Sequence, residues 1–278
     1  NMSQVNEIHN KTTEKTKQEQ IFIHLIVGFR EICIVTAALP LVTLVMCFIT
    51  AYIFQSEEIH ETHCRVYNVI PSISAITGVS PQRYFWRACI AFHIGPRVAI
   101  AAVYRNYYGN LVKRIRDPKI QKRTMFLVTT VFVLNLIEIG ALCGVTYVSN
   151  RENYPIHEKV FITFMICSLC HMLATIRLNE STAKISPAAR ESAAFSLYCK
   201  KILFFLSIAS TIGLVLFFLK HRFLCHDMAF SWFALCEYII ASANMGFHCT
   251  TMLDFPTEHF IVARGAETLK NHHEYKFE

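Results

Sequence analysis

The chain has 278 residues, of which 53% are hydrophobic and 17% charged, with a net charge of +7 at pH 7 and a mean hydropathy of +0.35. Soluble domains usually carry about 25% charged residues, so this composition excludes an ordinary soluble domain and favours a polytopic membrane protein. The basic residues lie in short stretches between apolar runs, which is typical of membrane topology and argues against a nucleic-acid-binding surface.

Six apolar segments approach the length needed to cross a bilayer, which is about 20 mostly apolar residues. The polar first 20 residues contain no signal-peptide core, so we expect the first apolar segment to remain as a span. The second segment is interrupted by His93, Pro96, Arg97 and Arg105, and could instead be an interfacial or re-entrant helix. We predict an all-α membrane protein, a six-helix transmembrane bundle. Its spans are expected at residues 32–54, 86–108, 125–148, 160–178, 202–219 and 228–253.

The distribution of basic residues predicts the orientation of this bundle. They are concentrated in three places: before the first span, between the second and third, and between the fourth and fifth. The positive-inside rule makes these regions cytosolic, so both tails, residues 1–31 and 255–278, are expected in the cytosol. The loop 55–85 and the short loops after the third and fifth spans then face the lumen. The basic residues are Lys11, Lys15, Lys17 and Arg30; Lys113, Arg114, Arg116, Lys119, Lys122 and Arg123; and Lys184, Arg190, Lys200 and Lys201.

This topology bears on several smaller features. The small and polar segment 179–198, "NESTAKISPAARESAAFSLY", is interpreted as a solvated cytosolic loop. The glycosylation sequons at Asn10 and Asn179 fall on the cytosolic side, so we expect neither to be modified. Cys64 and Cys225 lie in the predicted luminal loops, where thiols can be oxidised, so they are either a disulfide or two free thiols.

The last predicted span carries polar residues on one helical face. Glu237, Asn244, His248 and Thr251 are spaced seven, four and three residues apart, which aligns them at 3.6 residues per turn. We expect this stripe to face the bundle interior, because polar groups facing lipid are costly. Such residues are candidates for function, and the alternative is that they only hold helices together. Asp254 follows at the cytosolic exit, as an interfacial or capping group.

Four ionisable residues of three predicted spans are expected at similar depth. With a rise of roughly 1.5 Å per residue, they lie about 10–16 Å from the luminal ends of their spans. A histidine beside a carboxylate can act as a general base that activates a hydroxyl for acyl transfer. We therefore predict His93 as the base and Glu138 or Glu237 as its orienting carboxylate. Arg97 would pair with one of these carboxylates.

A second group of polar residues is expected nearer the cytosol. It contains His171, Asn244 and His248. Two or three histidines with a glutamate could bind zinc, but no local spacing such as HxxxH supports this, and we expect no metal. Hydrogen bonds that fix helix packing remain the alternative for these residues.

The end of the long luminal loop alternates arginines with aromatic residues. Arg83 and Arg87 lie one helical turn apart around Tyr84 and Trp86. Together with Arg97, they could hold the anionic phosphate of a lipid headgroup, because arginine pairs well with phosphate. The alternative is an interfacial anchor, since tryptophan and tyrosine concentrate at headgroup depth.

Two long motifs, "PSISAITGVSPQRYFWR" and "CEYIIASANMGFHCTTMLDF", make the chain resemble the Frag/DRAM/Sfk-type family of membrane proteins over most of its length. The parts "SPQRYFWR" and "NMGFH" favour the branch that acts in remodelling of glycosylphosphatidylinositol (GPI) anchors. The resemblance implies a multi-pass protein of the Golgi, or also of the endoplasmic reticulum, needed to reacylate lyso-GPI-anchored proteins with a saturated fatty acyl chain. Its partners would be GPI-anchored proteins, lyso-GPI and membrane lipids. The resemblance also favours the Cys64–Cys225 disulfide.

The function is left open between three classes. The leading hypothesis is an acyltransferase, or an essential component of one, although no HxxxxD acyltransferase motif starts at His93 or His248. The second is a non-enzymatic lipid-binding scaffold or trafficking adaptor for GPI-anchored proteins. The third is a small transporter or proton-coupled channel, against which the missing inverted repeat argues. No cofactor and no nucleic acid are expected, and the sequence does not identify the acyl donor.

Overall fold

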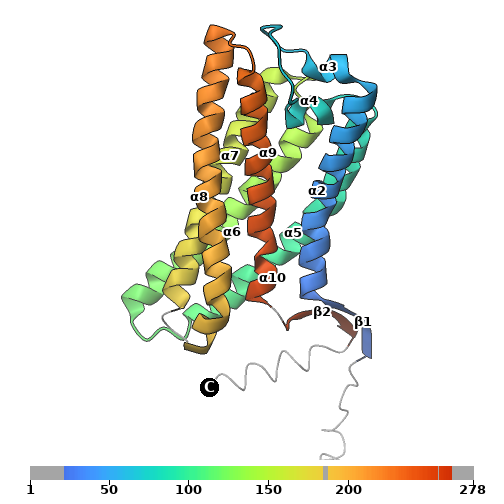
Figure 1. Cartoon of the computed structure of the whole chain (residues 1–278). Helices are drawn as coiled ribbons and strands as arrows, with labels where there is room; N and C mark the ends of the chain where they lie inside the picture. Colours follow the sequence, from blue (N-terminus) through green and yellow to red (C-terminus); the bar gives the residue numbers. More distant parts are fainter. Residues whose placement is uncertain (1–21, 184–186, 256, 265–278) are drawn as a thin grey trace, which may run out of the picture. The chain divides into compact units, whose positions relative to one another are not determined.

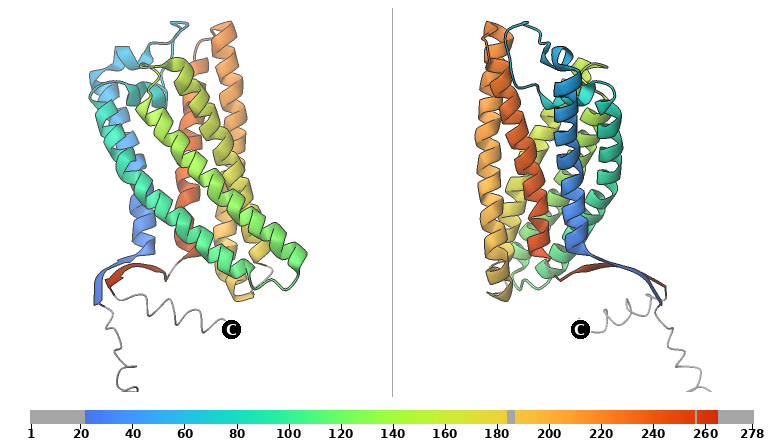
Figure 2. Two further views of the ribbon diagram at one scale, coloured as in Figure 1. Left: turned by 180° about the vertical axis from the view of Figure 1, so that it is seen from behind. Right: turned by 45° about the vertical axis from the view of Figure 1, so that its right-hand side comes forward.

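The computed structural model describes residues 22–183, 187–255 and 257–264 of the chain. Within these ranges the protein is mostly helical, with a bundle of long helices that run alongside one another (Figures 1 and 2). The chain forms two compact units, of which Arg30–Pro256 is the helical one. The long helices are α2 (Phe29–Phe54), α5 (Gln82–Val112), α6 (Pro118–Tyr147), α7 (Tyr154–Thr182), α8 (Pro187–Leu224) and α9 (Ala229–Cys249). The short helices are α3 (Ser56–His60), α4 (Ile73–Gly78) and α10 (Thr251–Asp254).

Four of the long helices in the described part of the chain, α2, α6, α7 and α8, are long and apolar enough to cross a membrane. This is therefore a multi-pass membrane protein. The other two, α5 and α9, do not meet this criterion; α5 buries His93 and Arg97, and α9 buries Glu237 and Asn244. α5 is continuous through Pro96. That all six helices span the bilayer, and that both termini are cytosolic, stay predictions.

Local sequence signals set where two helices begin. The side chain of Asp117 caps α6 by accepting a hydrogen bond from the backbone N–H of Lys119 at 2.8 Å, and Pro118 follows. The side chain of Asn153 caps α7 in the same way. Asp and Asn are favoured caps because their oxygens satisfy N–H groups that have no partner inside the helix, and proline suits the first turn. The Asp117 cap ends the short loop between α5 and α6, and the Asn153 cap ends the short loop between α6 and α7.

The prediction of a solvated loop at residues 179–198 is wrong. α7 continues to Thr182 and α8 begins at Pro187, so most of this segment is helical; residues 184–186 lie outside the described ranges. The reason is helix propensity: proline begins α8 and several alanines follow it, and alanine is the best helix former. Small and polar residues alone therefore do not indicate a loop in this segment. Asn179 is buried within α7, whereas Asn10 lies outside the described residues.

The three loops predicted to be luminal meet at one end of the bundle, the end that holds α3 and α4 (Figure 1). A disulfide joins Cys64 of the long loop to Cys225 of the loop between α8 and α9. Arg151, from the loop between α6 and α7, pairs with Glu58 of α3 at 2.7 Å. This shared end is what the predicted topology requires, and the compartment that it faces stays a prediction.

The second unit is a pair of strands that the sequence reasoning did not anticipate. β1 (Phe22–Gly28) pairs antiparallel with β2 (His259–Arg264), with Phe22 opposite Arg264 and Gly28 opposite His259. Both strands belong to the segments predicted as tails. Residues 1–21 and 265–278 lie outside the described ranges.

Replacing Cys64 by Ser should free the Cys225 thiol and lower thermal stability, because the long loop loses its covalent tie; natural disulfides contribute about 2–4 kcal/mol. Thiol labelling of the detergent-solubilised, folded protein measures the first effect and thermal unfolding the second. Cys170→Ser is the control, because Cys170 is an exposed free cysteine of α7. Equal thiol counts in C64S and C170S would contradict the disulfide.

Candidate functional site

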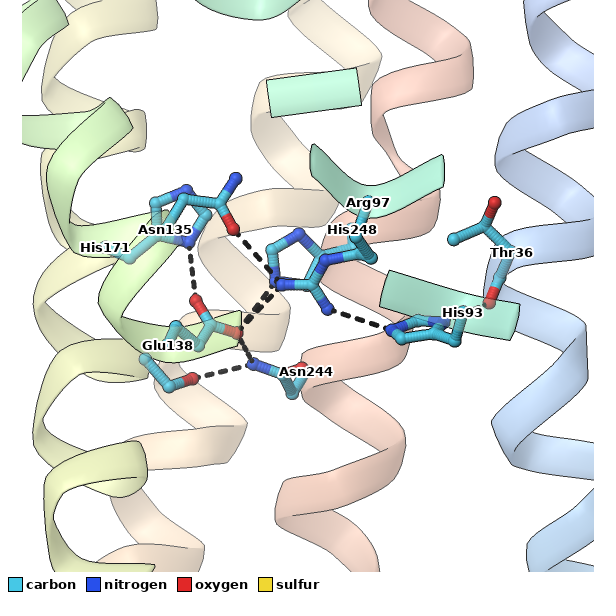
Figure 3. Close-up of polar contacts among 9 residues, drawn as sticks. Thr36, His93, Arg97, Asn135, Glu138, His171, Asn244 and His248 are labelled. Carbon is cyan, nitrogen blue, oxygen red and sulfur yellow. Dashed lines mark hydrogen bonds and ion pairs between the residues drawn. The ribbon is translucent and has the colours of Figure 1, made fainter. Parts of the chain in front are cut away.

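The centre of the bundle holds one completely buried carboxylate, that of Glu138 on α6 (Figure 3). Its Oε1 accepts a hydrogen bond from Asn244 Nδ2 at 2.8 Å and lies 2.9 Å from His248 Nε2, both on α9. Arg97 Nη2 of α5 donates to the same oxygen at 3.3 Å. On the other side, His171 Nδ1 of α7 lies 3.0 Å from Oε2. Four helices therefore converge on one carboxylate.

Arg97 supplies the positive charge of this cluster. Its Nη2 also donates to Asn135 Oδ1 at 3.2 Å and lies 2.9 Å from His248 Nε2. The same nitrogen of His248 thus faces a donor and an acceptor: it can accept from Arg97 when it is unprotonated, or donate to Glu138 when it is protonated. We call Arg97, Asn135, Glu138, His171, Asn244 and His248 the Glu138 cluster.

His93 borders the cluster on the side of α2. Its Nδ1 lies 2.7 Å from the backbone oxygen of Thr36, so Nδ1 carries the proton, because a carbonyl can only accept. Its Nε2 lies 3.5 Å from Arg97 Nη1. Figure 3 shows Arg97 between His93 and Glu138. The partner that orients His93 is therefore a backbone carbonyl, and its role as a general base stays a prediction.

Glu237 does not join this cluster. It is buried nearer the start of α9, beside α4, where its Oε2 accepts a hydrogen bond from the backbone N–H of Ile73 at 2.8 Å. The predicted division into an upper cluster with both glutamates and a lower one with the histidines is thus wrong. Counting residues gives depth along one helix, whereas the tilt and rotation of each helix decide which side chains meet. Of the predicted pairings, Arg97–Glu138 is the one that the structure forms.

Thr251, the last member of the predicted stripe, is buried in α10, after the helix break at Thr250. Close to it, the structure reveals a pair that sequence reasoning missed. Lys200 Nζ of α8 lies 2.7 Å from Asp254 Oδ2, with side-chain exposures of 1% and 3%. Ser196 donates to the other carboxylate oxygen at 2.7 Å. Asp254 is therefore a buried ion-pair partner that ties α8 to α10, and the prediction of an interfacial or capping group is wrong.

Arg83 and Arg87 lie together at the start of α5, but a carboxylate already faces them. Arg87 Nη2 lies 2.5 Å from Glu152 Oε2, and Arg83 Nη1 lies 3.7 Å from Glu152 Oε1. Hydrogen bonds from the backbone and hydroxyl of Ser149, with the Arg87 guanidinium, lower the pKa of Glu152 to about 2. Arg97 is almost three helical turns beyond Arg87 along α5 and does not join them.

A cavity of about 110 Å³ borders the Glu138 cluster on the side of α4. Its wall is mostly apolar, with aromatic and aliphatic side chains from several long helices. The predicted residues His93, Arg97 and Glu237 all line this cavity, although Glu237 does not contact the other two. Three further polar residues that sequence reasoning did not select as a site also line it: Ser74, Thr77 and His157.

Three members of the cluster could ligate a metal ion. One ligand atom each of Glu138, His171 and His248 lies within 4.8 Å of the others. The Arg97 guanidinium, however, already contacts both Glu138 and His248. A cation bound there would face this fixed positive charge, so the arrangement is better matched to a self-contained ion pair with histidines than to a metal centre.

Replacing Glu138 by Ala should unfold or strongly destabilise the protein, because Arg97 would stay buried without a counter-charge; breaking such a pair costs about 3–5 kcal/mol. Glu180→Ala is the matched control, because Glu180 pairs with Lys201 in a partly exposed position and should change stability little. Thermal unfolding in detergent measures both. Equal losses in E138A and E180A would contradict the central role of Glu138.

Replacing Glu152 by Gln should strengthen binding of vesicles that contain anionic phospholipid, because it frees Arg83 and Arg87. Glu58→Gln is the control: Glu58 has a similar exposure and pairs with Arg151 at the same end. The difference in binding between E152Q and the wild type should stay the same between about pH 7 and pH 5, since a carboxyl with a pKa of about 2 stays ionised there. The stability that Glu152 contributes is present above its ordinary pKa of 4.5 and lost as the pH falls toward 2. Equal binding by E152Q and E58Q would leave these arginines as interfacial anchors.

Comparison with known proteins identifies relatives along almost the whole chain. A family model described as the Frag1/DRAM/Sfk1/Cwh43P N-terminal domain matches residues 28–258, which include the Glu138 cluster and the cavity. A Drosophila melanogaster protein named "Post-GPI attachment to proteins factor 2-like" is 59% identical over 249 residues, covering 90% of this chain and 76% of that protein.

More distant relatives carry related names. A Xenopus tropicalis protein named "Acyltransferase PGAP2" is 34% identical over 84% of this chain and 90% of its own length. A Caenorhabditis elegans protein named "Post-GPI attachment to proteins factor 2" is 31% identical over 86% of this chain and 89% of its own. No solved structure matches the chain.

Proposed function

The chain belongs to the Frag1/DRAM/Sfk1/Cwh43P family, and we propose that it acts in the remodelling of GPI anchors. More specifically, it reacylates lyso-GPI-anchored proteins with a saturated fatty acyl chain in the Golgi membrane, or also in that of the endoplasmic reticulum. The names of its relatives support this proposal, since they refer to GPI attachment and, in the frog protein, to acyl transfer.

The observation that carries the proposal is the cavity inside the bundle. Reacylation must bring a fatty acyl group to a hydroxyl of a lyso-lipid. Ligand sites typically combine apolar walls with a few convergent polar groups. Here the walls are mostly apolar, as an acyl chain requires, and His93, His157 and Glu237 are titratable groups that could move a proton.

The Glu138 cluster gives this cavity fixed walls. Its contacts join α5, α6, α7 and α9, and the bond from His93 to the Thr36 carbonyl adds α2. These contacts favour a fixed arrangement of the helices that line the cavity. The position of the reacting groups is therefore decided by the bundle before any substrate enters, which favours catalysis by orientation.

The phosphate of the lyso-lipid would be held outside the cavity. Arg83 and Arg87 lie at the α3/α4 end of the bundle, where a headgroup could displace Glu152 from them. Arg97, in contrast, is committed to Glu138, so its part in phosphate binding is indirect at most. In this proposal the headgroup lies at the bundle end and the acyl chains lie among the helices.

Purified protein in liposomes should transfer one acyl chain to lyso-GPI. Two reactions run in parallel, one with an acyl-CoA and one with a diacyl phospholipid as donor, and mass spectrometry of the lipids detects the product. Arg177→Ala is the control variant, because the Arg177 side chain is 68% exposed. Lyso-GPI binding without transfer from either donor would overturn the enzymatic function and support a lipid-binding scaffold.

His93→Ala should lower the surface level of GPI-anchored proteins when it is returned to cells that lack this protein, because His93 lines the cavity and holds α5 to α2. His248→Ala should do the same through the Glu138 cluster. Flow cytometry gives the surface level, and an immunoblot checks expression of each variant. Full restoration by both variants at wild-type expression would exclude a functional role for these histidines.

A further inference from the structure

A serine and a histidine from distant parts of the chain meet at the cavity. Ser74 Oγ, in the first turn of α4, lies 2.9 Å from His157 Nε2, in the first turn of α7. The two residues are 83 positions apart, so no local motif contains both. His157 is buried, with 8% of its surface exposed, whereas Ser74 is only partly buried.

The other nitrogen of His157 is also held. His157 Nδ1 lies 2.7 Å from the backbone oxygen of Val148, which can only accept, so Nδ1 carries a proton. In the neutral ring, Nε2 then presents a lone pair to the Ser74 hydroxyl. This is the arrangement of an activated serine nucleophile: a hydroxyl, a histidine that can take its proton, and an acceptor that fixes the tautomer of that histidine.

The pair lies where two cavities adjoin. Ser74 and His157, with Phe161 and Glu237, line both the cavity beside the Glu138 cluster and a second one of about 240 Å³. The walls of the second cavity come from α4, α7, α8 and α9 and are again mostly apolar. A ligand in either cavity would therefore lie beside Ser74 and His157.

Contacts other than that of Ser74 hold the start of α4. The N-terminus of α4 is capped by Ser72, whose Oγ accepts the N–H of Ala75 at 3.1 Å. α4 is also held to α9 by the bond from Ile73 N–H to Glu237 at 2.8 Å. The start of α4 is thus fixed without Ser74, and the Ser74 hydroxyl is left to face the cavity.

We propose that Ser74 and His157 are the nucleophile and general base of acyl transfer, an inference that rests on the proposed function. As Ser74 Oγ bonds to the acyl carbon of an ester or thioester donor, its proton passes to His157 Nε2. The bond from the acyl carbon to the donor oxygen or sulfur breaks, and His157 returns the proton to that leaving group. An acyl-serine remains on the enzyme.

The second half of the reaction reverses these steps with a new acceptor. A hydroxyl of the lyso-lipid gives its proton to His157 Nε2 while its oxygen bonds to the acyl carbon. The bond to Ser74 Oγ breaks, and Ser74 recovers the proton. The products are the reacylated lipid and the original enzyme, so every atom and proton is accounted for.

The test is covalent capture of the acyl group on full-length protein in liposomes. The protein is incubated with an alkyne-tagged acyl-CoA or an alkyne-tagged phospholipid, without lyso-GPI, and the modified peptide is identified by mass spectrometry. We expect the label on Ser74, none at this position in Ser74→Ala, and labelling about 100-fold slower in His157→Gln, the usual effect of losing a general base. Ser74→Cys should accumulate an acyl group that hydroxylamine removes.

A second serine of the same region serves as the control for folding. Ser231 Oγ accepts the N–H groups of Val69 and Ile70, at 2.7 and 3.2 Å, and so holds the segment before α4 to α9. Ser231→Ala should lower the thermal transition yet keep the label on Ser74. If S74A is folded and S231A and S74A lose labelling equally, the effect is structural and the proposal is overturned.

The same samples separate this inference from the proposed function. Transfer to added lyso-GPI by S74A at the wild-type rate would overturn the nucleophile while the proposed function stands. Labelling of Ser74 with no transfer to lyso-GPI would support Ser74 and His157 as the nucleophile and base, and would overturn lyso-GPI as the acceptor. Absence of both labelling and transfer with either donor would overturn the pair and the enzymatic function together.

Discussion

The structure of the bundle depends on one interaction, the neutralisation of the fully buried Glu138 carboxylate. A buried carboxylate is tolerated only when charges and donors surround it, and the alternative costs several kcal/mol. Arg97, His171, Asn244 and His248 meet this requirement from three neighbouring helices. To keep these contacts, each helix must hold one rotation about its axis and one position along it. The carboxylate therefore fixes the register of α5, α6, α7 and α9.

This fixed register helps to shape the apolar cavities at whose border Ser74 and His157 meet. The polar groups of the Glu138 cluster contact mainly one another, which suits the cluster to hold the helices, whereas the Ser74 hydroxyl lines the cavity beside a histidine of fixed tautomer. Structure and chemistry are thus assigned to separate groups of polar residues. In the proposed reaction, burying both within one bundle would let the acyl chain stay among the helices while its carbonyl reaches a polar site.

The features that the sequence predicts correctly are those that depend on a single segment of the chain. Hydropathy located the long helices, and helical periodicity placed Asn244 and His248 on a face that the bundle buries. It could not show contacts that depend on how the helices are rotated. Lys200–Asp254 and Ser74–His157 are such contacts, since their members lie in separate elements. Strand β1 was missed because its pairing partner lies more than 200 residues away, and a helical segment at 187–198 was mistaken for a loop.

The most direct test of this account is an experimental structure of the protein with a non-hydrolysable acyl-donor analogue, such as an acyl ether of coenzyme A or of a phospholipid. The account predicts that the alkyl chain fills the apolar cavities between α4, α7 and α9. The atom that replaces the acyl carbon should lie about 3–3.5 Å from Ser74 Oγ, as a reactive arrangement requires. An analogue bound on the outer surface of the bundle, with Ser74 and His157 away from it, would contradict the account.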